Sequence, residues 1–184
     1  MIVLLFGCKS APQETPPEPE APPEPNILTQ DEIDVIDEVI NHLITYELKN
    51  IKGDMQVCIN SAFFVHRMNY SDSYEDDLKK SEHRLKNEMT IDDRVISSYI
   101  QRNIKRRNIE KNDYFKADFF WNGGTPRIPY FRTLFSNIGF DETRTKALLY
   151  VYVDLPGWMF AEYVYLEKRN GKWAFNKCLL AWLT

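Results

Sequence analysis

The sequence contains no run of roughly 20 apolar residues, the length that a helix needs to cross the hydrocarbon core of a membrane. It also lacks a glycine-rich phosphate loop, a CxxC pair and a Gly-x-Ser-x-Gly nucleophile elbow. The three histidines, His42, His66 and His83, are scattered. These absences exclude a membrane-spanning helix from the sequence and leave no motif for nucleotide binding, thiol redox chemistry or serine hydrolysis.

A metal site is not indicated either. Glu38 and His42 are four residues apart in a predicted helix, where they could present two ligands on one face. No third ligand has a matching spacing, and a contact on the helix surface explains the pair equally well. We therefore expect neither a metal ion nor another cofactor, and the sequence identifies no catalytic residue.

Positive charge is sparse. Four glutamates and one lysine give residues 1–26 a charge of -3, and the total of -4 leaves -1 for residues 27–184. A nearly neutral domain lacks the electrostatic footprint of a nucleic-acid-binding protein. The one basic cluster, Lys105-Arg106-Arg107, follows a predicted helix, where cations offset the helix dipole. We expect a solvated helix end there rather than a patch for phosphates or lipid headgroups.

The first eight residues form an apolar run that ends in Leu5-Phe6-Gly7-Cys8. This run resembles the lipobox of bacterial lipoproteins. The resemblance implies that the Cys8 thiol is lipidated, that the preceding peptide is removed and that the new N-terminus is acylated. A secretory signal needs a basic segment and an apolar stretch of roughly 7–15 residues, so residues 1–8 are expected to be the end of a truncated signal peptide.

Residues 9–26 predict a disordered, extended spacer. Seven of the ten prolines lie in residues 11–25, interleaved with glutamate, and such a tract can neither bury surface nor form a helix. In the polyproline II conformation the spacer would span on the order of 50 Å. A stiff acidic segment after a lipidated cysteine would hold a domain away from a bilayer. The expected location is the cell envelope, and Lys9, which is not the retaining aspartate of the enterobacterial sorting rule, favours the outer membrane.

Residues 27–184 predict a single α+β domain. Thr29 and Glu32 form a capping-box pattern, and apolar residues then recur every three or four positions to about Leu48. A polar segment, 71–88, predicts an exposed helix or a mobile excursion. Thr90 to Asp93 opens another capped helix, with an apolar face at Val95, Ile96, Tyr99, Ile100 and Ile104. Between these helices, residues 55–65 predict a strand, and residues 108–130 are expected to be irregular.

The last part of the sequence predicts an antiparallel four-stranded meander at 131–140, 145–153, 160–168 and 173–183. Asn170-Gly171 is a strong signal for a type I′ hairpin turn. The run from Ala147 to Val153 is apolar on both faces. One face is expected to meet the N-terminal helices, and the other must be covered, line a cavity or meet a partner.

Helices followed by a meander that ends in Gly171-Lys172-Trp173 are similar to the cystatin-like cone of the nuclear transport factor 2-like superfamily. The resemblance implies a cone-shaped pocket against the sheet. An enzyme of that architecture would need carboxylates inside the cone. Glu162, on the third meander strand, is expected to face water, and a perturbed general base is the alternative.

Trp158, Met159 and Phe160 at a hairpin tip form a candidate binding surface, and Trp121 in the irregular segment is a second candidate. These side chains could instead cap the end of the core. We expect a non-catalytic, membrane-anchored binding domain for an envelope protein or small ligand. A small hydrolase or isomerase is the alternative, and a structural accessory is a third.

Cys58 and Cys178 remain once Cys8 is assigned. An oxidising compartment permits a disulfide between them, which requires Cα atoms within about 7 Å. Both lie in predicted strands, so two buried thiols are the alternative.

Overall fold

The structure is a computed structural model that describes residues 27–47, 56–59, 62–63, 74–104, 107–108, 119–121, 130–155 and 157–183. Its main feature is a seven-stranded sheet with the order β4-β1-β5-β7-β8-β9, in which the short β6 also pairs with β7. The strands are β1 (Gln56–Ile59), β4 (Phe119–Trp121), β5 (Tyr130–Phe135), β6 (Gly139–Phe140), β7 (Lys146–Leu155), β8 (Trp158–Arg169) and β9 (Lys172–Leu183).

The predicted antiparallel meander is confirmed: β5, β7, β8 and β9 pair in sequence order. Asn170 and Gly171 both have positive φ in the β8–β9 turn, as the Asn-Gly pair predicts. The first predicted strand, 131–140, is two strands separated by residues 136–138. The sequence did not predict the parallel pairing of β1 with β5 and of β4 with β1. Parallel partners are far apart in the sequence, so no turn signal announces them.

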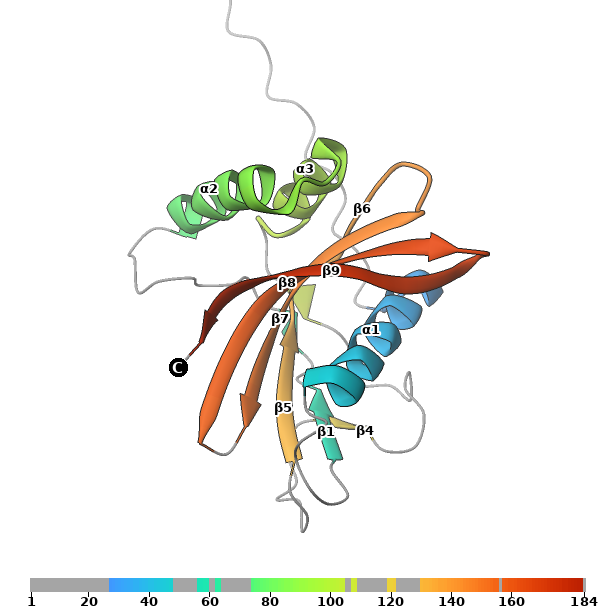
Figure 1. The fold of residues 1–184 in the computed structure, drawn as a ribbon, viewed down its shortest axis with the longest axis vertical. Coiled ribbons are helices and arrows are strands. Elements are labelled where there is room, and N and C mark those ends of the chain that lie inside the picture. Colours follow the sequence, from blue (N-terminus) through green and yellow to red (C-terminus); the bar gives the residue numbers. More distant parts are fainter. Residues whose placement is uncertain are drawn as a thin grey trace, which may run out of the picture.

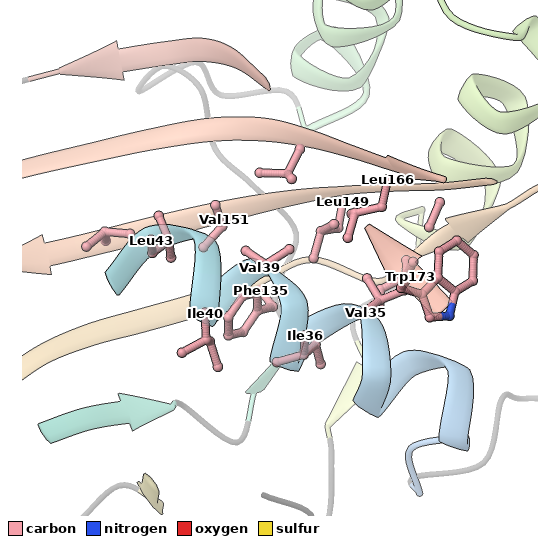
Figure 2. Packing of buried hydrophobic residues seen from close by; sticks show 14 of the residues in the cluster. Val35, Ile36, Val39, Ile40, Leu43, Phe135, Leu149, Val151, Leu166 and Trp173 are labelled. Atoms are coloured by element: carbon pink, nitrogen blue, oxygen red, sulfur yellow. The ribbon is translucent and has the colours of Figure 1, made fainter. Parts of the chain in front are cut away.

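One face of the sheet is covered by helix α1 (Gln30–His42) and its continuation η1 (Leu43–Glu47). The predicted capping box is present, with Thr29 and Glu32 exchanging hydrogen bonds. Figure 2 shows the apolar stripe of α1 directed at the sheet, where it packs on Phe135, Leu149, Val151, Leu166 and Trp173. Each fully buried aliphatic side chain of this stripe contributes roughly 1.5–3 kcal/mol to folding; they are Val35, Ile36, Val39, Ile40 and Leu43.

The other face is covered by α3 (Asp93–Arg102) and η2 (Leu85–Met89), which continues α2 (Tyr74–Arg84). Leu148 and Tyr150 of β7 point to this side and pack with Leu85, Val95 and Tyr99. Figure 1 shows α1 on one side of the sheet and α2 and α3 on the other. The α+β class with helices packed on the meander is therefore confirmed, and the face that the sequence left open is covered by helices.

Two local predictions need correction. Thr90 does not open α3: it lies in the left-handed region at the end of η2, and Asp92 caps α3 by accepting from the backbone N–H of Arg94. Ile104 is 57% exposed because α3 ends before it. The polar segment 71–88 forms a helix from Tyr74 onward, as one of its two alternatives predicts, although Leu78 and Leu85 are buried.

The predicted strand 55–65 contains two strands, β1 and β2 (Ala62–Phe63). β2 pairs with β3 (Arg107–Asn108) in a separate two-stranded sheet. The signal and spacer predictions for residues 1–26, with Cys8, lie outside the described residues, as do His66 and most of segment 108–130. No helix in the described ranges is long and apolar enough to span a membrane.

The sheet order excludes the disulfide, which was one of the two alternatives for Cys58 and Cys178. Cys58 lies in β1 and Cys178 in β9, and these strands are four positions apart in the sheet. At about 4.8 Å per strand, the separation along the sheet is roughly 19 Å, well beyond the reach of a disulfide. Cys178 is exposed, so the prediction that it is buried is also wrong.

The break between β5 and β6 docks α3 onto the sheet. Asn103, at the end of α3, exchanges buried hydrogen bonds with the backbone of Asn137 at 2.9 and 3.0 Å. Ser136 accepts from the backbone N–H of Tyr150 at 2.8 Å. Gly139 then lies directly against the Tyr99 backbone, where a Cβ atom would overlap main-chain atoms. This close approach brings the α3 layer onto β6 and β7.

We predict that Gly139→Ala destabilises the protein by about 1–3 kcal/mol, because the added methyl group must push α3 away from β6. Urea unfolding measures the loss. Gly171→Asn is the control: this turn position has open space and a positive φ that asparagine tolerates, so it should change the stability much less. Equal stability of Gly139→Ala and the parent protein would contradict the close packing.

Candidate functional site

The end of the sheet at the β7–β8 connection exposes Trp158 and Met159, each 36% accessible. Trp158 stacks on Phe160 with ring centroids 5.2 Å apart. Met159 points to the other side of β8, where its sulfur accepts a hydrogen bond of 3.0 Å from the Tyr152 hydroxyl. The two exposed side chains are therefore held in place by neighbouring aromatic residues.

The end of β9 adds two exposed leucines beside them, because Leu183 pairs with Phe160 and Leu180 with Glu162. Leu180 is 51% exposed and Leu183 is 59% exposed. Directly opposite residues share a face of the sheet, so both leucines lie on the α1 side with Trp158. We call Trp158, Met159, Leu180 and Leu183 the distal surface.

The structure supports only part of the predicted binding surface. Trp158 and Met159 are exposed as the prediction requires, but Phe160 is 4% exposed and belongs to the core. Phe160 therefore supports Trp158 from beneath. Trp121 lies in β4, four strand positions from β8, and its side chain is outside the described part. Sequence reasoning missed Leu180 and Leu183, because residues three apart lie on opposite faces of a regular strand, and it is the β-bulge between them that brings both to one face.

An aromatic cluster lies on the α3 side of the distal surface. The Trp182 indole donates to the Tyr150 hydroxyl at 3.0 Å, and its ring lies 5.6 Å from Tyr152. Tyr163 donates to Ser81 of α2 at 2.6 Å. Burial raises the pKa of Tyr150 far above its usual value, so its hydroxyl stays neutral. These contacts tie β7, β8 and β9 to one another and to α2 beside the distal surface.

Glu162 does not face water as expected: it is 4% exposed. It lies on the α1 side of β8, directly opposite Val151 and Leu180. Its same-face neighbours along the strand are Phe160 and Val164, both of which belong to the core. The sequence did not indicate this burial, because it depends on α1, which lies over a hundred residues earlier in the sequence.

Within the described residues, a group of buried charges lies at the start of α1. The Glu32 side chain, fully buried, accepts from Arg107 at 2.7 Å, from Arg102 at 3.1 Å and from the Thr29 backbone N–H at 2.8 Å. Burial alone raises the pKa of Glu32. The hydrogen bonds from Arg107 and Thr29, with the charges of both arginines, outweigh burial and hold that pKa below its usual value.

Asp31 forms a second set of contacts at the same helix end. It accepts from Lys168 at 2.7 Å, from Arg144 at 2.9 Å and from the Trp173 indole at 3.2 Å. Burial opposes the effect of these donors, which together lower the pKa of Asp31. All these donors belong to the fold itself, so the acidic pair holds elements together and presents no open carboxylate to a ligand.

Arg107 corrects the prediction of a solvated basic cluster. It is 6% exposed in β3, and it donates to Glu32 and, at 2.7 Å, to the Ile27 carbonyl. No sequence signal identified it, because its partner lies 75 residues earlier and the adjacent Lys105 and Arg106 suggested a solvated run.

The predicted Glu38–His42 pair serves packing. Glu38 accepts from the backbone N–H of Phe175 at 3.2 Å, and the His42 ring stacks on the Phe175 ring with centroids 3.5 Å apart. Among the residues that the structure describes, no group of three or more histidine, cysteine, aspartate or glutamate side chains could hold a metal ion.

The chain matches no known protein-family model, and no curated protein or solved structure shows significant similarity to it. Any function must therefore be argued from the residues and their geometry.

We predict that acid destabilises the protein through Glu32. A carboxylate whose folded pKa lies below its unfolded value contributes stability that is complete above the unfolded pKa of about 4.5 and is lost as the pH falls through the folded pKa. The free energy of unfolding, measured in urea from pH 7 to pH 2.5, should therefore fall below pH 4.5. Glu32→Gln should reduce this slope.

The control for that measurement is Glu142→Gln, which removes an exposed carboxylate from the β6–β7 turn. If the free energy of unfolding of Glu32→Gln falls with decreasing pH as steeply as that of Glu142→Gln, the buried ion cluster is not the acid-sensitive element.

Proposed function

We propose that this protein is a lipid-anchored binding domain of the bacterial cell envelope, and that it contacts a partner through the distal surface. The lipid at Cys8 and the spacer 9–26 hold the domain at a membrane, with the outer membrane favoured by Lys9. The observation that carries the binding proposal is a group of four exposed apolar side chains at the ends of β8 and β9 away from their hairpin turn, with Trp158, Leu180 and Leu183 on the α1 side and Met159 on the other side. Exposed apolar patches of this kind are typical of interaction sites.

The position of the spacer supports this arrangement. The spacer joins the domain at Ile27, whose carbonyl is held by Arg107 beside the start of α1. Asp31 ties that helix end to Lys168 and Trp173, on either side of the β8–β9 turn. Trp158 is ten residues from Lys168 along β8, roughly 34 Å in an extended strand. The start of α1, which the spacer precedes in the sequence, and the distal surface therefore lie at opposite ends of β8. This separation keeps the distal surface away from the point where the anchored chain enters the domain.

A fitting partner is a protein surface or small ligand with apolar groups. Trp158 and Met159 supply large contact area, and the stacking of Trp158 on Phe160 reduces the entropy lost on binding. The near-neutral charge of residues 27–184 offers little attraction for nucleic acid, so none is proposed as a partner.

Glu162 is the one observation that favours the alternative, a small hydrolase or isomerase. A buried carboxylate can serve as a general base. Its same-face neighbours Phe160, Val164 and Val151 are apolar. Turnover of ester or enol substrates that is abolished by Glu162→Gln in a folded protein would favour the enzyme.

We predict that cells fed a palmitate analogue label the protein at Cys8. The label should disappear in Cys8→Ala, because that thiol is the acceptor in the lipobox-like run. Cys58→Ala is the matched control and should remain labelled. Label that persists in Cys8→Ala would refute the anchor.

We predict that a photoreactive phenylalanine analogue in place of Met159 forms one discrete crosslinked adduct in living cells. The same analogue in place of Lys172, exposed at the opposite hairpin, is the control and should not form it. Trp158→Glu should abolish the adduct, because a charge opposes burial of the distal surface in a complex. An adduct that survives Trp158→Glu would place the binding site elsewhere.

A further inference from the structure

The outer edge of β9 is closed by side chains from the helices. In the described residues β9 ends the sheet, and it is twelve residues long. Such an edge offers a row of backbone N–H and C=O groups to any strand that approaches. Natural proteins cover or charge these edges to prevent strand addition, so the groups that occupy the β9 edge show how it is protected.

Arg84, the last residue of α2, occupies the end of this edge. Its guanidinium donates to the carbonyl of Leu180 at 3.1 Å and to the carbonyl of Ala181 at 3.2 Å. Glu88, one turn later, accepts from the same guanidinium at 3.0 and 3.2 Å. The carboxylate fixes the guanidinium plane, so both carbonyls are held by a charged donor that an incoming strand cannot easily displace.

Glu38 of α1 occupies the start of the edge by accepting from the Phe175 backbone N–H at 3.2 Å. Between the positions contacted by Glu38 and Arg84, Lys177 links β9 to the end of η2 by donating to the carbonyls of Met89 and Thr90. The helices on the two faces of the sheet thus each send a charged side chain to the same backbone edge.

We propose that Arg84 and Glu38 close the β9 edge against strand addition, and that removal of the Arg84 guanidinium allows two copies of the chain to pair antiparallel along β9. A second copy fits because antiparallel pairing of identical strands obeys a two-fold axis and joins two sheets into one. Leu180 and Leu183 are exposed on this strand, and pairing would cover part of both. Arg84 and Glu38 occupy backbone groups at the outer edge of β9, and they leave the exposed side chains of the distal surface accessible.

The test compares Arg84→Met, which keeps the apolar stem but removes both donors, with Lys86→Met. Lys86 lies two residues away and pairs with Glu82, so its replacement changes the charge equally without touching β9. Light scattering during size-exclusion chromatography of the full chain should show Arg84→Met dimerising on the order of tenfold more tightly than Lys86→Met. Arg84→Met that stays monomeric like the control would overturn the proposal.

A second variant shows where the dimer forms. Leu180 pairs with Glu162 next to a β-bulge, in which Ala181 is the extra residue. The Leu180 carbonyl faces outward, and because the N–H and C=O of one residue point to the same side of an antiparallel strand, its N–H also faces outward and is not needed by β8. Adding Leu180→Pro to Arg84→Met should restore the monomer with an unchanged circular dichroism spectrum. A dimer that persists would show that β9 is not the interface.

Hydrogen exchange decides the matter if the proline variant does not fold. In the Arg84→Met dimer, the backbone amide of Leu180 should exchange more slowly than in the parent protein, because it would donate to the second copy. An unchanged exchange rate at this position in a proven dimer would overturn the proposal.

Discussion

The buried carboxylate of Glu32 is the constraint on which the arrangement of layers depends. It completes the cap of α1 on one face of the sheet, and it accepts from Arg102 of α3 on the other face and from Arg107 of β3. A buried charge without partners is strongly destabilising, so the three elements can fold only in a geometry that keeps these contacts together. Asp31, one residue earlier, adds Lys168 and Trp173 of the β8–β9 hairpin to the same centre.

The contacts of Glu32 and Asp31 lie at one end of the sheet, and the distal surface lies at the other end. Helix α1 starts at the β8–β9 turn and covers the middle of the sheet, so the far ends of β8 and β9 extend beyond it. Trp158 and Leu183 are exposed there because no described helix reaches them. The position of the distal surface is therefore a consequence of where α1 is fixed.

Features determined by neighbouring residues could be predicted from the sequence. The Thr29–Glu32 capping box and the Asn170-Gly171 turn are examples, because each depends on residues within one turn of chain. Features determined by distant residues could not. Arg107 was expected in solvent because its partner Glu32 lies far away in the sequence, and Glu162 was expected in solvent because the strand pattern does not tell which face a helix covers. Thr90 was mistaken for a cap because Asp92, two residues later, competes for the same role.

The most direct test of the central role of Glu32 is a double-mutant cycle with Arg107. The stabilities of Glu32→Gln, Arg107→Met and the double variant, measured by urea unfolding, isolate the coupling energy of the pair. The account predicts a coupling of about 2–3 kcal/mol, in the upper part of the range for residues in one buried network. A coupling below about 0.5 kcal/mol, the level at which independent sites add, would contradict it.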